Sequence, residues 1–208
     1  MNEFSFSVPQ NITVGKGSLT KLPEIAKKSG GSHAFLMSGP HLAKMGLVEK
    51  AANSLKSAGI SVDTFTDIEG NPSVETVDKA TAAFKEAGAD FIVAFGGGSP
   101  MDVAKAVGVV ATYGGKIFDY EGNFKVPGPI VPIFAIPTTA GTGSEVTASA
   151  VITDEKTHFK STIFSYHNLP KFAILDPELI MTAPAHIAAA CGVDALIHAL
   201  EAYLSRNA

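Results

Sequence analysis

The stretch FIVAFGGGSPMDVAKA, residues 91–106, decides the fold. An apolar run leads directly into three glycines at 96–98, and an alanine-rich stretch with helical spacing follows at once. Apolar residues without alternation are typical of a strand that is buried on both faces. Ser99 is a favoured N-cap residue and Pro100 suits the first helical position, so we expect the helix to begin there. A strand that turns directly into a helix predicts one unit of an α/β fold.

The same alternation continues on both sides of this stretch. Strands are predicted over residues 33–39, 60–66, 90–98, 129–137 and 172–180. Helices are predicted over residues 41–58, 73–88 and 99–112. The middle helix has a Ser73 N-cap and a Gly88 stop, which are typical helix ends. The fold class is therefore α/β, a Rossmann-like parallel sheet flanked by helices on both faces.

Two segments depart from this alternation. Residues 145–164 read as two extended segments joined by the polar turn TDEKTH, which predicts an added β-hairpin. From Thr182 onward the sequence is helical in character, with Pro184 at a helix start. We therefore expect an α/β domain over residues 1–182 and the first helices of a truncated all-α domain over residues 183–208.

Composition excludes several classes of protein. The 208 residues carry a net charge of −4, with acids and bases scattered along the chain, which argues against nucleic acid or a membrane surface as the main partner. The first twelve residues show no secretory signal, and no apolar run reaches the ~18 residues of a membrane span without a Pro or Gly. One cysteine, Cys191, excludes an internal disulfide and fits a reducing compartment. The expected location is the cytoplasm.

The glycine turn is a candidate phosphate site. Glycines let a phosphate approach the backbone, and a helix N-terminus supplies free N–H groups and a positive dipole. Asp102 is expected at the third helical position, where it could reach back to the cap or contact a ligand. The pattern is not GxGxxG, and a tight strand-to-helix turn with a good cap would use the same residues. Both readings stay open at this point.

A second loop of small residues, AIPTTAGTGSE at 135–145, follows the next strand. It places the hydroxyls of Thr138, Thr139 and Thr142 among alanine and glycine. The carboxyl end of a parallel strand is where α/β sheets bind ligands. An ordinary polar loop is the alternative.

Asp194 and His198 are four residues apart in an apolar helical run, so they share one face, with Glu201 a turn further on. A carboxylate oxygen and an imidazole nitrogen suit Fe²⁺ or Zn²⁺. Two ligands do not make a metal site, and a hydrogen-bonded pair at a helix contact would have the same spacing. The other histidines, at positions 33, 41, 158, 167 and 186, have no comparable partner in the sequence.

Together these segments resemble the iron-containing alcohol dehydrogenase family, of the dehydroquinate synthase-like fold. The matching motifs, in the family order, are GGGSPMDVAKA, IPTTAGTGSEVT, VITD and GVDALIHALEAY, together with NPS at 71–73. The resemblance covers nearly the whole chain. It implies an NAD- or NADP-dependent, Fe²⁺-dependent oxidoreductase, with Zn²⁺ as an alternative metal, that exchanges hydride between small alcohols and aldehydes or ketones. The resemblance is also compatible with a homodimer.

The resemblance also implies roles for particular residues. Gly97, Gly98 and Ser99 would bind the cofactor pyrophosphate, Asp102 would lie near the nicotinamide, and Asn71 would contact the adenosine side. Thr138, Thr139 and Thr142 would line the cofactor cleft, and Lys160 would reach a cofactor ribose. Asp194 and His198 would be the first two of four metal ligands, with the other two histidines outside this chain. Residues 1–182 would then be the dinucleotide-binding domain, and residues 183–208 the start of the metal-binding domain.

One departure from the family concerns cofactor choice. Many relatives carry an acid after the second strand, where it would accept from the adenosine 2′-hydroxyl and repel a 2′-phosphate. Gly39 stands there in this chain, so we expect NADP to be tolerated.

Two rival functions remain. A dehydroquinate synthase-like lyase shares the fold, but it would need many basic residues, which are scarce near these motifs. A nucleotide-binding fragment with no catalysis is the second. The substrate, and whether the truncation is natural, are open.

Overall fold

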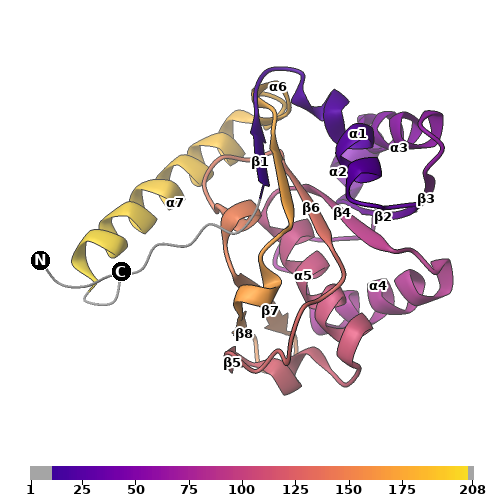
Figure 1. Ribbon diagram of the computed structural model, residues 1–208. Helices are drawn as coiled ribbons and strands as arrows, with labels where there is room; N and C mark the ends of the chain where they lie inside the picture. Colours follow the sequence, from indigo (N-terminus) through magenta and orange to yellow (C-terminus); the bar gives the residue numbers. More distant parts are fainter. Residues whose placement is uncertain (1–10, 206–208) are drawn as a thin grey trace, which may run out of the picture.

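Six strands form one parallel sheet in the order β1-β9-β6-β4-β2-β3, as seen in a computed structural model that describes residues 11–205 (Figure 1). Each neighbouring pair in this sheet is parallel, which confirms the predicted sheet. Its strands are β1 (Asn11–Val14), β2 (His33–Met37), β3 (Ser61–Phe65), β4 (Phe91–Gly96), β6 (Ile133–Pro137) and β9 (Phe172–Leu175).

Helices cover both faces of this sheet. The α-helices are α1 (Leu22–Lys28), α2 (Pro40–Lys44), α3 (Leu47–Ser57), α4 (Val74–Ala87), α5 (Gly98–Tyr113), α6 (Pro177–Ile180) and α7 (Ala185–Leu204). Successive side chains of a strand point to opposite faces. Accordingly, Phe35 and Met37 of β2 pack in the core cluster of α4 and α5, while Leu36 packs in the cluster of α1 and α3. The absence of polar alternation in these strands thus follows from burial on two sides.

The helix ends predicted from local sequence agree with the structure for α4 but not for the helix predicted over residues 41–58. Helix α4 is capped as predicted, because the Ser73 hydroxyl accepts from Thr76 N and Gly88 ends the helix at φ 65°. The prediction of one continuous helix over residues 41–58 was wrong, because this segment forms two helices, α2 and α3. Gly46 adopts φ 74°, a left-handed conformation that glycine tolerates, and this residue separates α2 from α3.

The hairpin is formed, but it belongs to a sheet of its own. Strands β7 (Ser149–Asp154) and β8 (Phe159–Phe164) pair antiparallel, and β5 (Gly122–Asn123) adds to β8 in parallel. Strand β1 and helix α1 were not predicted. The last predicted strand, 172–180, ends at Leu175, because Asp176 caps α6 by accepting from Glu178 N. Short 3₁₀ segments lie at Ser18–Lys21, Ile117–Tyr120, Ser144–Val146 and Tyr166–Asn168.

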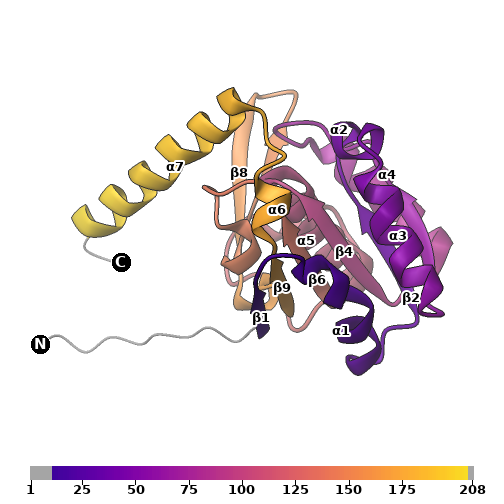
Figure 2. The ribbon, with the colours of Figure 1, turned by 90° about the horizontal axis from the view of Figure 1, so that it is seen from above.

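Helix α7 stands away from the sheet in both views (Figures 1 and 2), and none of its residues is buried. With 20 residues and a mean hydropathy of 1.4, it is long and apolar enough to cross a membrane by length and composition alone. The expectation that no run has this property was therefore wrong, because Gly192 lies inside the helix without ending it. The domain boundary near residue 182 stays a prediction. Residues 1–10 and 206–208, at the ends of the two predicted domains, lie outside the described residues.

Candidate functional site

Two adjoining cavities lie where β4 and β6 end and α5 begins. One, of about 850 Å³, we name the Asp102 cavity, and the other, of about 670 Å³, the Gly39 cavity. They share the lining residues Gly98, Ser99, Thr142 and Cys191, so they adjoin, and we refer to the two together as the cleft. The predicted site residues on the Asp102 cavity are Asn71, Gly98, Ser99, Asp102, Thr142, Lys160, Asp194 and His198. Those on the Gly39 cavity are Gly39, Gly97, Gly98, Ser99, Thr138, Thr139 and Thr142.

The glycine turn at the centre of the cleft differs from the predicted cap. Helix α5 begins at Gly98 with Gly97 as its N-cap, and no side chain within residues 11–205 caps it. Ser99 is therefore not the N-cap, and Pro100 is not the first helical residue. A β-carbon on Gly97 would lie 3.2 Å from Thr139 Oγ1, and one on Gly98 would lie 3.1 Å from Thr142 Cγ2. Glycine lets the two loops approach, and the uncapped first turn leaves N–H groups for a ligand.

Asp102 does not cap α5 either, because its carboxylate turns to the second loop and the hairpin. Asp102 Oδ1 accepts from Ser144 Oγ at 2.7 Å, and Asp102 Oδ2 accepts from Val151 N at 3.2 Å. The Lys105 ammonium lies 3.8 Å from Oδ1. Burial raises the pKa of the Asp102 carboxyl above its ordinary value, although Lys105 and both hydrogen bonds favour the ionised form.

Lys105 is fully buried one helical turn after Asp102. Its Nζ donates to Ser149 O at 2.7 Å, to Ser144 Oγ at 2.8 Å and to Thr147 Oγ1 at 3.2 Å. Burial lowers the pKa of Lys105 to about 8, against the opposing attraction of Asp102 and Glu145. Asp102 and Lys105 thus lie 3.8 Å apart and are linked by hydrogen bonds through Ser144, and removing Asp102 would leave the buried ammonium without its nearest carboxylate.

The threonine loop packs directly on the glycine turn. Thr138 N donates to Gly96 O at 2.9 Å, which fixes the end of β6 beside the end of β4. The side chains of Thr139 and Thr142 then lie over Gly97 and Gly98. Parallel strands bring their carboxyl ends to one edge of a sheet, and this edge is where the two motifs meet.

Lys160 and Asn71 both line the Asp102 cavity, and their side chains are hydrogen-bonded to each other. Lys160 Nζ donates to Asn71 Oδ1 at 2.7 Å, and Asn71 has a left-handed φ of 55°. Thr153 N donates to Pro72 O at 2.9 Å, which ties this loop to β7. Asn71 lines the same cavity as Asp194 and His198, and its expected place on the adenosine side of the cofactor stays a prediction. The 89-residue separation of Asn71 and Lys160 gives no local signal of their contact.

Asp194 and His198 share one face of α7 as predicted, with His198 Nδ1 3.8 Å from Asp194 Oδ2. Both side chains are about half exposed and line the Asp102 cavity. Helix α7 reaches this cavity through a close approach, because a β-carbon on Gly141 would collide with Cys191 O. Within residues 11–205, no group of three or more His, Cys, Asp or Glu side chains could hold a metal ion.

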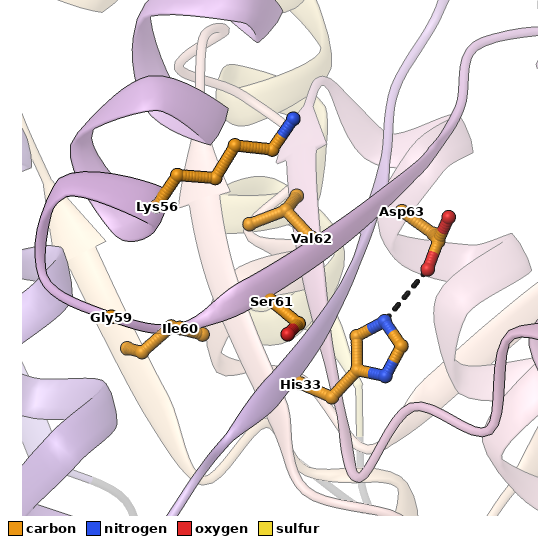
Figure 3. A pocket seen from close by; sticks show the side chains of 7 residues that line it. All are labelled: His33, Lys56, Gly59, Ile60, Ser61, Val62 and Asp63. Carbon is orange, nitrogen blue, oxygen red and sulfur yellow. Dashed lines mark hydrogen bonds and ion pairs between the residues drawn. The ribbon is translucent and has the colours of Figure 1, made fainter.

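A hollow at the opposite end of the sheet contains none of the predicted site residues (Figure 3). It lies at the amino ends of β2 and β3, where His33 Nε2 is 2.7 Å from Asp63 Oδ2. His33 has no comparable partner nearby in the sequence, and the parallel pairing of β2 with β3 brings Asp63 beside it from 30 residues away.

The cleft also contains residues that the motifs alone did not single out. The Asp102 cavity is also lined by Ser144, Thr147, Ser149 and Val151. Lys105 donates hydrogen bonds to the first three of these residues. A sequence signal for Lys105 existed, since it is a lysine within the otherwise apolar face of MDVAKAVGVVA. Buried lysines are rare unless they are paired, so that position called for a partner.

Fold and cleft together define a parallel α/β protein with its candidate site at the carboxyl edge of the sheet. Residues 9–177 match the model of the family described as iron-containing alcohol dehydrogenase. The chain belongs to the iron-containing alcohol dehydrogenase family. It is 39% identical over 204 residues to the NAD-dependent methanol dehydrogenase of Bacillus methanolicus, covering 98% of this chain and 54% of that protein.

Solved structures agree with this assignment. A crystal structure of 1,3-propanediol oxidoreductase superposes with a TM-score of 0.94 at 40% identity, covering 100% of this chain and 54% of that one. Sulfoacetaldehyde reductase from Bifidobacterium kashiwanohense, crystallised with NAD⁺, gives a TM-score of 0.84 at 34% identity, covering 93% and 51%. The chain thus spans about half the length of the curated relatives it matches.

Proposed function

We propose that this chain binds NAD or NADP in the cleft, as the nucleotide-binding portion of a metal-dependent oxidoreductase that interconverts small alcohols with aldehydes or ketones. The observation that carries the proposal is that two kinds of group meet in one cleft. The uncapped start of α5 offers backbone N–H groups, and α7 brings Asp194 and His198 to the same cavity. Family membership supports the same reading.

The residues present fit both groups. Gly97, Gly98 and Ser99 would hold the pyrophosphate against the helix N-terminus. The carboxylate of Asp194 and the imidazole of His198 are suitable donors for Fe²⁺ or Zn²⁺. When bound, the metal supplies Lewis-acid chemistry to an alcohol oxygen and the nicotinamide accepts a hydride. The chain's own part is to orient the nucleotide and to contribute two of the metal's ligands.

The 208-residue chain is expected to bind nucleotide but to show no detectable alcohol oxidation, even with added Fe²⁺. Two donors leave a metal ion under-coordinated, so binding should be weak. NADH formation with a panel of small alcohols measures this directly, with metal affinity measured by calorimetry. Turnover that disappears in Asp194→Ala would contradict the expectation.

Cofactor choice is a second test. Gly39 lines its cavity without a side chain, and Glu69 in the same cavity already accepts from Ser73 N and Thr76 Oγ1 through one oxygen. We therefore expect NADP to bind with an affinity similar to that of NAD. Gly39→Asp should weaken NADP binding by about tenfold or more, because a carboxylate would face the 2′-phosphate.

Gly39→Asn is the matched control, since it adds the same bulk without charge. A β-carbon at this position would lie 3.1 Å from Ile68 O, so bulk alone has some effect on both cofactors. Equal losses of NADP affinity in the two variants would refute the role of charge.

The proposed location of this enzyme is the cytoplasm. A single cysteine and the family's small-molecule chemistry support a cytoplasmic enzyme. A homodimer is the assembly to test first, by light scattering of the purified chain.

A further inference from the structure

Lys105 is a fully buried lysine beneath the proposed nucleotide site, and its ammonium is held by hydrogen bonds. All three of its donors are taken, by Ser144 Oγ, Thr147 Oγ1 and Ser149 O, so its position is fixed. All three acceptors belong to residues 144–149, and this segment joins the threonine loop to the hairpin. Lys105 therefore ties helix α5 to a segment that lines the Asp102 cavity.

Ser144 bridges Lys105 and Asp102 through its hydroxyl group. Its hydroxyl accepts from Lys105 Nζ at 2.8 Å and donates to Asp102 Oδ1 at 2.7 Å. The Asp102 side chain is 16% exposed, and it lines the cavity together with Asp194 and His198. Without a nearby cation, a carboxylate this buried would tend to bind a proton.

Resting on the proposed function, we infer that Lys105 is a positioning residue that keeps Asp102 ionised and aimed into the cavity, and so makes the cleft favour oxidised over reduced nicotinamide. The oxidised ring carries a positive charge and the reduced ring does not, so a fixed carboxylate attracts only the oxidised form. The glycine turn binds pyrophosphate, which both forms share, and it does not discriminate between them.

The test compares dissociation constants for NAD⁺ and NADH, each measured by calorimetry on the 208-residue chain. Lys105→Met should raise the ratio Kd(NAD⁺)/Kd(NADH) by about tenfold, the order expected for one charge interaction in a partly solvated cavity. A purely structural role would weaken both forms equally. An unchanged ratio would overturn the inference, and so would a lowered one, because it would mean that Asp102 stays ionised without Lys105. Lys79→Met, at an exposed lysine that pairs with Glu75, is the matched control and should leave the ratio unchanged.

Two further variants keep the test decisive if Lys105→Met does not fold. Ser144→Ala removes the link without removing a buried charge, and it should shift the ratio in the same direction by a smaller factor. In an Asp102→Asn background, Ser144→Ala should change the ratio no further, because the link acts through Asp102. An independent shift in that background would refute the inference. If the unmodified chain binds neither NAD⁺ nor NADH, the proposed function itself fails, which is a different outcome from an unchanged ratio.

Discussion

Replacing Gly98 by alanine is expected to raise the Kd of the chain for NAD⁺ by about 10- to 100-fold. The added β-carbon would lie 3.1 Å from Thr142 Cγ2, at the point shared by the two cavities. A phosphate could then no longer approach the first turn of α5, and at least one charge-assisted hydrogen bond to a backbone N–H would be lost. Fluorescence or calorimetric titration with NAD⁺ measures the effect.

Gly192→Ala is the matched control for this substitution. Its β-carbon would meet nothing within 4 Å, and it lies in α7 outside the lining of either cavity. NAD⁺ affinity should stay unchanged, while the helix gains roughly 1 kcal/mol of intrinsic propensity. Wild-type affinity in Gly98→Ala, together with a native circular dichroism spectrum, would show that the glycine turn is not the pyrophosphate site.

The largest effect on stability is expected from Phe134→Ala, at about 3–5 kcal/mol of unfolding free energy. Phe134 is fully buried on β6, with its ring centroid 4.9 Å from that of Phe91 and 4.7 Å from that of Phe172. The substitution therefore leaves a cavity between three neighbouring strands. Because β6 leads into the threonine loop, the loss should also loosen the cleft. Urea unfolding followed by circular dichroism measures the change.

Phe159→Ala provides the comparison at an exposed phenylalanine on β8, where 61% of the residue is accessible. Its effect should stay within about 0.5 kcal/mol, as for surface substitutions generally. Equal destabilisation by the two variants would mean that β6 does not hold the centre of the core.

The parts of this molecule that could be predicted are those encoded by neighbours in sequence. Ser73 and Gly88 mark the ends of α4 because capping depends on residues within one turn. The i, i+4 spacing of Asp194 and His198 likewise gave their shared face. Every residue given a binding role from the motifs lines the cleft, and the roles themselves remain proposals.

The parts that could not be predicted depend on distant segments. The orientation of Asp102 is set by Ser144 and Val151, 42 and 49 residues away, so its local option of capping α5 loses to longer-range hydrogen bonds. Strand β1 exists because β9 pairs with it, and a four-residue strand has too little pattern to be recognised alone. The contact of Asn71 with Lys160 is of the same kind.

The position of β1 has a consequence for synthesis on the ribosome. Its neighbour in the sheet is β9, and the turn after it is held by Asp176, which accepts from Gly17 N and Leu19 N. At the usual elongation rate of about 5–20 residues per second, the first strand emerges on the order of ten seconds before its partner. Strand β1 therefore cannot be paired in the sheet until β9 (Phe172–Leu175) has been translated, so the edge of the sheet closes late in synthesis.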